Sequence, residues 1–154
     1  MHFISHRGNV SGPVPDRENR MDYILEAMEA GFDVEIDVWI IDGHFFLGHD
    51  DPQYLIHEDF LKSHVSRLWC HAKHATSLRA LLKLGMHVFS HDRDPVVLTS
   101  KGVPWAFPGQ PLDDITVCVM PERVEGAYST EELKRCGGIC SDFVSKYRAT
   151  LVEL

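Results

Sequence analysis

Short apolar runs alternate along the chain with segments in which apolar residues recur every three or four positions. The run at residues 2–5 predicts a buried strand that ends at His6. Apolar side chains in the segment 20–30 fall on one helical face, and Gly31 follows as a stop signal. The first part of the chain therefore predicts a strand followed by an amphipathic helix.

The next apolar run predicts a β-hairpin. Residues 32–41 are rich in β-branched and aromatic side chains, and the Asp-Gly pair at 42–43 is typical of a tight turn before a second strand within 44–50. Successive side chains of a strand point to opposite faces, so Glu35 and Asp37 should share one face.

The alternation continues through the middle of the chain. Residues 56–64 predict a short helix, 67–73 a strand, 77–85 a helix and 86–92 another strand. Repetition of strand, helix and strand favours an α/β fold with a parallel sheet and right-handed crossovers.

The pattern loosens in the last third. Residues 92–114 contain four of the eight prolines and show no helical period, so we expect the units around this segment to be linked by loops. Residues 115–122 predict a strand. Residues 129–136 predict a short helix that opens with a capping box, and 137–143 predict a last strand.

Composition places this pattern in an ordinary globular protein. With 154 residues, 44% of them hydrophobic and 25% charged, we expect one domain spanning 1–154. The net charge of −8 argues against general binding to a nucleic-acid backbone, but it leaves room for a local cationic pocket. No apolar run is long enough to predict a membrane span, and the first residues show no secretory signal, so the expected location is the cytoplasm.

The four cysteines are spread along the chain, and the favoured interpretation is that they are buried free thiols. A zinc site that includes Cys136 and Cys140 is the alternative, although no second close pair of Cys or His accompanies them.

Polar side chains gather where the predicted strands end. In a parallel barrel or open sheet these ends meet at one rim, which is where α/β enzymes place their chemistry. The residues concerned are His6, Arg7, Glu35, Asp37, His71, Lys73, His91, Asp92, Glu122 and Asp142.

Glu35 and Asp37 narrow the chemistry of this rim. Two carboxylates buried on one strand face repel each other, so either one is protonated or a cation holds them. Hard oxygen ligands suit Mg²⁺ or Ca²⁺. The alternative is an exposed edge strand that leaves both carboxylates in water.

Cationic and titratable side chains complete the pattern. Arg7 and Lys73 supply fixed positive charge suited to a phosphate. His6 and His49 can exchange protons near neutral pH. Each histidine alone is more often structural, and only the joint arrangement indicates a catalytic site.

Four short motifs together resemble one enzyme family. They are HRG at 6–8, EN at 18–19, AG at 30–31 and DVEIDVWIIDGHFFLGHD at 33–50. They strongly resemble the glycerophosphodiester phosphodiesterase family, whose TIM-barrel fold is related to that of the phosphatidylinositol-specific phospholipases C. The resemblance covers residues 3–50 and implies cleavage of phosphodiesters with a divalent metal.

The resemblance implies a role for each matching residue. His6 and His49 match the catalytic pair, one protonating the leaving alkoxide and the other acting as base or nucleophile. Arg7 matches the phosphate-binding arginine. Glu35 and Asp37 match two metal-binding carboxylates.

Three further positions follow from the same resemblance. Glu18 matches a glutamate on the metal side of the rim, and Lys73 matches a lysine two residues after a third metal-binding glutamate. His71 occupies the position of that glutamate. Histidine in place of that glutamate leaves three alternatives open. The site prefers Mn²⁺ or Zn²⁺, or it holds Mg²⁺ with two carboxylates, water and substrate, or the protein has lost catalysis.

The length predicts a reduced barrel. A TIM barrel typically takes about 250 residues, so we expect a compact or incomplete (β/α) barrel of the phospholipase-C-like type, with several outer helices reduced to loops after His91. Barrel wall exposed near residues 95–115 would need cover from a loop or a second subunit, which makes a homodimer a candidate assembly. Trp105 and Phe107 are expected in the core, with the substrate pocket as the alternative.

The sequence thus predicts a metal-dependent phosphoric diester hydrolase that acts on a small glycerophosphodiester-like molecule by histidine acid/base catalysis. One alternative is a catalytically reduced barrel that binds a phosphorylated ligand. The other is a phosphomonoesterase, which would keep the metal and the cations.

Overall fold

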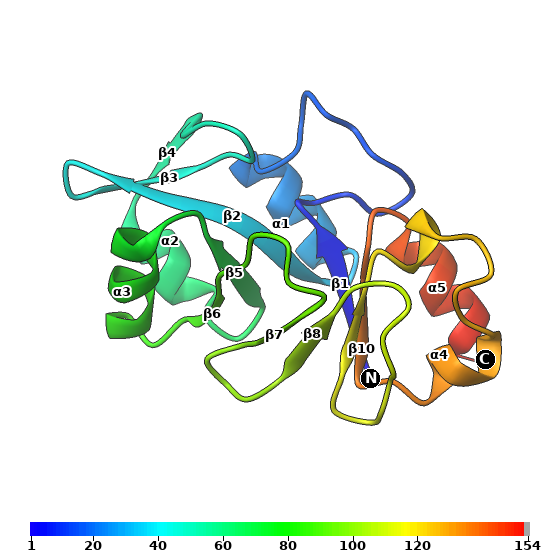
Figure 1. Cartoon of the computed structure of the whole chain (residues 1–154). Helices are drawn as coiled ribbons and strands as arrows, with labels where there is room; N and C mark the ends of the chain where they lie inside the picture. The colour runs from blue at the N-terminus through cyan, green and yellow to red at the C-terminus, as the bar shows by residue number, and fades with distance from the viewer. Residues whose placement is uncertain (153–154) are drawn as a thin grey trace.

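The computed structural model describes residues 1–152 and contains a curled sheet surrounded on part of its outer face by helices (Figure 1). The strands are β1 (His2–His6), β2 (Asp33–Ile41), β3 (His44–Leu47), β4 (Tyr54–Ile56), β5 (Leu68–Ala72), β6 (His87–Phe89), β7 (Val96–Leu98), β8 (Pro104–Ala106), β9 (Val117–Val119) and β10 (Gly138–Ser141). The helices are α1 (Met21–Glu29), α2 (Glu58–Ser63), α3 (Ala75–Lys83), α4 (Thr130–Lys134) and α5 (Val144–Leu151), with a 3₁₀ turn η1 (Pro121–Arg123).

The sheet is parallel over most of its width. Strands run in the order β6, β5, β2, β1, β10, β9 and β8, all parallel to their neighbours, while β3 and β4 form an antiparallel extension of β2 and β7 pairs antiparallel with β8. No ladder among residues 1–152 joins β6 to β7 or β8. The gap is bridged instead by the backbone N–H of Ser100, which donates to the carbonyl of Val88 at 2.8 Å.

Alternation along the strands separates two cores. The outward side chains of β2, including Val34 and Ile36, pack against the helices. The inward side chains of β5, β6 and β8 fill the curled sheet with aromatic rings, among them Trp69, Phe89 and Trp105. This alternation also turns Glu35 and Asp37 inward, above the aromatic layer.

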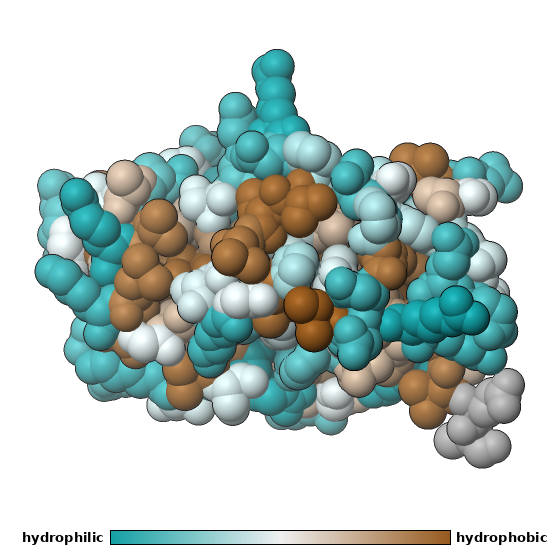
Figure 2. Space-filling model, turned by 60° about the horizontal axis from the view of Figure 1, so that its bottom comes forward, coloured by the Kyte–Doolittle hydropathy of each residue, from teal (hydrophilic) through white to brown (hydrophobic). Residues whose placement is uncertain are grey.

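Helices cover only part of the wall. Figure 1 shows α3 beside β5 and β6 and α5 beside β10, whereas none of the helices within residues 1–152 lies over the β7–β8 hairpin. Val96 and Leu98 there are 42% and 70% exposed. Figure 2 shows the face at the bottom of Figure 1, where hydrophobic groups form separate clusters between hydrophilic ones.

The α/β class and the incomplete barrel are confirmed, while the homodimer stays a prediction.

Several segments differ from the sequence-based expectation. Residues 92–114 were expected to contain units linked by loops, with barrel wall near 95–115, and the structure places β7 and β8 there, although no strand bounds were predicted. Each of these strands has three residues, too few to show a period, and proline lies beside or within each of them. Strand β4 and helix α5 were not predicted either. The helix has few buried residues, which are Val144 and Leu151.

Other local predictions are confirmed. Helix α4 begins with a capping box in which Ser129 and Glu132 bond each other's backbone N–H groups. All four cysteines are buried free thiols. No helix within residues 1–152 has the length and apolar character that crossing a membrane requires.

Candidate functional site

A tight turn at the end of β1 sets the position of His6 and Arg7. Arg7 has a φ of 58° and Gly8 a φ of 96°. The N–H of Arg7 donates to the carbonyl of Glu35 at 2.9 Å, and its carbonyl accepts from the N–H of Asn19 at 3.0 Å. A side chain at Gly8 would meet the Tyr23 ring, since a Cβ there would lie 2.6 Å from Cδ1. Hydrogen bonds to Glu35 and Asn19 thus hold the left-handed backbone at Arg7, and the Tyr23 ring leaves room only for glycine at position 8.

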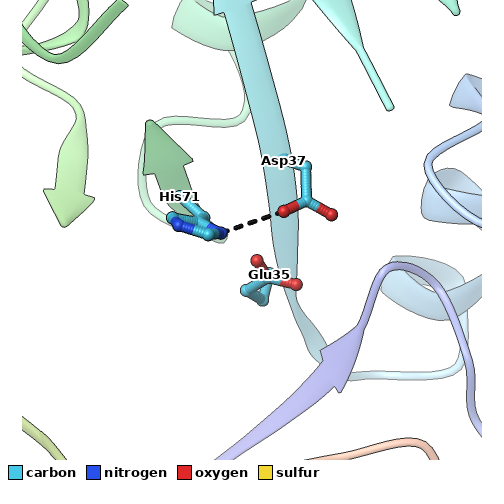
Figure 3. A group of neighbouring side chains, drawn as sticks. All are labelled: Glu35, Asp37 and His71. Carbon is cyan, nitrogen blue, oxygen red and sulfur yellow. Dashed lines mark hydrogen bonds and ion pairs between the residues drawn. The ribbon is translucent and has the colours of Figure 1, made fainter. Parts of the chain in front are cut away.

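Three side chains at the ends of β2 and β5 form a cluster with metal-ligand chemistry. One ligand atom from each of Glu35, Asp37 and His71 lies within 4.8 Å of the others. Figure 3 shows Glu35 and Asp37 projecting from the same strand, with the His71 ring facing them. The register explains this, because Asp37 is paired with His71 across the parallel ladder.

Asp37 is surrounded by donors. Its Oδ1 accepts a hydrogen bond from His71 Nδ1 at 3.0 Å, and Lys73 Nζ lies 3.5 Å from the same oxygen. Its Oδ2 accepts from the Asn19 amide at 2.9 Å and forms an ion pair with Arg7 Nε at 3.0 Å. Burial alone would raise the pKa of Asp37, but the His71 hydrogen bond and the charges of Arg7 and Lys73 lower it well below its usual range. Asp37 is therefore ionised at neutral pH.

Glu35 has the opposite environment. Only 3% of it is exposed, and its Oε2 is buried without a hydrogen-bond partner among residues 1–152. The nearest basic nitrogen within ion-pair distance of it is His6 Nε2, at 3.9 Å. Burial and the neighbouring Asp37 raise the pKa of Glu35. An orphaned carboxylate oxygen beside a second carboxylate and an imidazole fits a divalent cation.

His6 is held by a network from the far end of the chain. Its Nδ1 donates to Asp142 Oδ1 at 2.7 Å, which directs Nε2 toward Glu35. The amide nitrogen of Asn9 donates to Asp142 and to Glu18, each at 2.8 Å. Burial would raise the pKa of Asp142, but the hydrogen bond from His6 lowers it. Asp142 is thus a carboxylate at neutral pH and orients the His6 ring.

A second constrained turn carries His49. A Cβ at Gly48, whose φ is 154°, would lie 1.9 Å from the carbonyl of Asp51, so only glycine fits. The indole of Trp39 donates to the carbonyl of Gly48 at 2.6 Å. The Nδ1 of His49 donates to Asp50 at 2.8 Å. Burial and then the charge of Arg7 lower the pKa of His49, which favours the neutral ring.

His6, Arg7, Glu35, His49 and His71 line one pocket with a volume of about 120 Å³. Its other wall is apolar and aromatic and includes Trp105 and Phe107. Trp105 also lies in the barrel core. Both positions considered from the sequence for Trp105, the core and the pocket wall, therefore apply. The pocket is lined by His6, Arg7, Glu35, His49, His71, Phe89, His91, Trp105, Phe107, Val119, Met120 and Arg123.

The residues predicted from sequence do not all take the same place. Asp37 does not line the pocket itself but contacts Arg7 and His71, which do, and Lys73 lies beside Asp37. Glu18 lies outside the three-residue metal cluster and pairs with Arg7 at 3.2 Å and with Asn9. Its metal-binding role stays a prediction.

Sequence reasoning gave no role to several groups that the structure brings to the site. Asp142 was recognised only as a polar strand end, and Asn19 only as part of a motif. Asn9 was not singled out, although its side chain joins Glu18 to Asp142. Arg123 follows β9 and lines the pocket. The sequence carried a signal for Asp142, its place directly after a strand, and for Asn19, its place in the EN motif, but none for Asn9 or Arg123.

Comparison with known protein families finds no match, and comparison with curated protein sequences finds none either. Comparison with solved structures finds the crystal structure of a glycerophosphodiester phosphodiesterase from Agrobacterium tumefaciens, with a TM-score of 0.57 and 15% sequence identity. The match covers 97% of this chain and 99% of that one. This likeness shows the fold. It agrees with the barrel type expected from the motifs at residues 3–50.

Proposed function

We propose that the protein is a metal-dependent phosphodiesterase that acts on a small glycerophosphodiester-like substrate. One observation carries the proposal: the cluster of Glu35, Asp37 and His71 lies beside His6 and Arg7 at the end of a barrel-like sheet. The structural neighbour is a glycerophosphodiester phosphodiesterase, and this likeness supports the proposal together with the motif resemblance.

The cluster has the donor set for a divalent ion. Glu35 would provide its unpartnered Oε2, and Asp37 and His71 the other ligand atoms. Mg²⁺ and Ca²⁺ suit the carboxylates, while the imidazole of His71 adds Mn²⁺ and Zn²⁺ as candidates. When bound, such an ion would neutralise charge on the phosphate and polarise it toward attack.

Two histidines would move the protons. His49 has a lowered pKa, so its neutral ring can accept the proton of the attacking hydroxyl. His6 is oriented by Asp142 and would donate a proton to the leaving alkoxide. Both line the same pocket, as acid and base acting on one phosphate require.

Fixed cations would stabilise the transferred phosphate. Arg7 lines the pocket, and its guanidinium is held by Asp37 and Glu18. Burial would lower the pKa of Arg7, but Asp37 and Glu35 raise it, so the side chain stays charged. Charge held in place before the reaction stabilises a transition state without further reorganisation.

A binding protein without catalysis is the second candidate. The donors around Asp37, including Lys73 and Arg7, already neutralise that carboxylate without a metal. A phosphorylated ligand could then be held by cations alone. This alternative leaves the unpartnered Oε2 of Glu35 and the His6–Asp142 pair without a role.

The test is hydrolysis of bis(4-nitrophenyl) phosphate with Mg²⁺, Mn²⁺, Ca²⁺ or Zn²⁺ added in turn to metal-stripped protein. We expect turnover that requires metal and falls at least about a hundredfold in His6→Ala and in His49→Ala. His57→Ala, at an exposed position on the outer surface, is the matched control. Absence of turnover with every metal on this diester and on glycerophosphodiesters, in protein shown to be folded, would favour the binding alternative. Faster turnover of 4-nitrophenyl phosphate would indicate a phosphomonoesterase.

A further inference from the structure

Arg123 occupies the side of the pocket away from the metal cluster. It ends η1, directly after β9, where Met120 turns the chain with a φ of 49°. Its backbone N–H donates to the carbonyl of Met120 at 3.0 Å, which fixes the turn. In the sheet, β10 separates β9 from β1, so two strand spacings, or roughly 10 Å, lie between the strand of Arg123 and that of Arg7.

The charge of Arg123 is not compensated within the described chain. Arg7, the other guanidinium of the pocket, is paired with Asp37 and Glu18. Among residues 1–152, no carboxylate lies within ion-pair distance of Arg123. Its neighbour Glu122 points elsewhere and accepts from the hydroxyl of Ser141 at 2.7 Å and from the backbone N–H of Asp142 at 3.0 Å.

The Trp105 part of the adjoining aromatic wall offers no cage for an ammonium group. A cage of this kind needs open ring faces. Trp105 is 2% exposed, and its ring lies 4.6 Å from that of Phe89 and 5.6 Å from that of Trp69, centroid to centroid. Its faces are therefore covered. The described residues that line the pocket include one carboxylate, Glu35, which belongs to the metal cluster.

The pocket is also small. A volume of about 120 Å³ is below the roughly 300–1,000 Å³ typical of pockets that enclose drug-sized ligands. It can enclose a phosphate with a short alcohol group. An acyl chain or a nucleoside would extend outside it.

We propose that Arg123 sets substrate choice by charge, selecting small phosphodiesters whose second alcohol group is anionic and disfavouring those with a choline or ethanolamine group. This inference rests on the proposed phosphodiesterase function and names the substrate class of the same site. With the phosphate at the metal cluster and Arg7, the head group extends toward β9. There it meets an unpaired guanidinium and no carboxylate.

Three glycerol 3-phosphate diesters of similar size test the proposal. One carries choline, one the alcohol of 4-hydroxybutanoate and one neutral butanol, and the measurement is kcat/KM for release of the head alcohol. In the wild-type protein we expect kcat/KM for the anionic diester to exceed that for the choline diester by about tenfold. In Arg123→Gln this ratio should fall to about twofold, and in Arg123→Glu the choline diester should be the better substrate. Arg79→Gln, on the exposed face of α3, removes the same charge far from the pocket and should change nothing.

The outcomes separate this inference from the proposed function. Turnover of the neutral diester with equal rates for all three would overturn the role of Arg123 and leave the phosphodiesterase intact. An equal fall in all three rates in Arg123→Gln would also overturn it, because that result places Arg123 on the phosphate. If no diester is hydrolysed, the affinities of the same three compounds are measured by calorimetry. Tighter binding of the anionic diester than of the choline diester, with this difference lost in Arg123→Gln, supports the charge selection. Equal affinities overturn it.

Discussion

The Nδ1 atom of His6 lies 2.7 Å from Oδ1 of Asp142, although 136 positions separate the two residues in the chain. The contact exists because β1 and β10 are parallel neighbours, so His6, the last residue of β1, and Asp142, directly after β10, lie at the same rim. The same Asp142 oxygen accepts a hydrogen bond from Asn9. The orientation of the His6 ring therefore depends on a carboxylate that is itself held in place.

Replacing Asp142 by Asn should lower kcat by about a hundredfold with little change in KM. An amide keeps the shape but presents the wrong group to Nδ1, so the ring loses its fixed orientation and tautomer. The measurement is steady-state hydrolysis of bis(4-nitrophenyl) phosphate with the best metal. Asp59→Asn, at an exposed position on α2, is the control. A parallel loss in the control, or an unchanged kcat in Asp142→Asn, would contradict the role of the pair.

His71→Glu should shift the preferred ion from Mn²⁺ or Zn²⁺ toward Mg²⁺ or Ca²⁺. The substitution replaces an imidazole in the three-residue cluster with a hard oxygen ligand and adds one negative charge. Activity and calorimetric affinity are measured for each ion in turn. His57→Glu adds the same charge on the outer surface and should leave the order of ions unchanged. An identical order in both variants would place His71 outside the metal site.

His87 should make the fold less stable as the pH falls below 6.5. Burial and the neighbouring Lys101 lower the pKa of His87 to about 4, and its Nε2 shares a hydrogen bond of 2.7 Å with Thr99. Between pH 6.5 and 4 the His87 ring therefore binds a proton more readily in the unfolded chain than in the folded protein. Its contribution to the free energy of unfolding is fully present above pH 6.5 and is lost as the pH falls toward 4. The loss from pH 7 to 5.5 should be about 1 kcal/mol.

Urea unfolding at several pH values measures this dependence. The slope between pH 6.5 and 4 should be smaller in His87→Gln, because glutamine keeps polar atoms but does not titrate. His57→Gln, which removes an exposed histidine, should keep the wild-type slope. Equal slopes in the wild-type protein and His87→Gln would show that His87 does not carry the effect.

Gly8→Ala should destabilise the fold by about 3 kcal/mol. The added Cβ combines a left-handed backbone with an overlap against the Tyr23 ring at 2.6 Å. Gly43→Ala is the matched control, since Gly43 also has a positive φ of 80° but has open space around it. Its cost should be about 1 kcal/mol. Similar urea midpoints for the two variants would exclude the overlap with Tyr23 as the cause.

The sequence predicted those parts of the fold whose signals are local. The hairpin of β2 and β3 follows from a long run of β-branched residues and an Asp-Gly turn, and α1 follows from its amphipathic spacing. The bounds of β7 and β8 could not be predicted, because proline lies beside or within each of them and the pairing of β8 with β9 joins segments separated in the chain. The incomplete barrel followed from length and from the motif resemblance.

The candidate site was predictable in its residue types but not in its partners. The pairing of Asp37 with His71 depends on the register of β2 and β5, which no local pattern encodes. The role of Asp142 depends in the same way on the pairing of β1 with β10. The exposed Arg123 became notable only when the structure placed it on the pocket wall without a partner.

The pairing of β1 with β10 also has a consequence for folding kinetics. Strand β1 is made first but acquires its second neighbour only after more than a hundred further residues have been synthesised. Closing such long loops before the contacts form is slow, and contacts of high sequence separation are associated with slow folding. During that interval β1 presents an open edge and His6 lacks Asp142, so the fixed orientation of the His6 ring should be among the last features that the folding chain acquires.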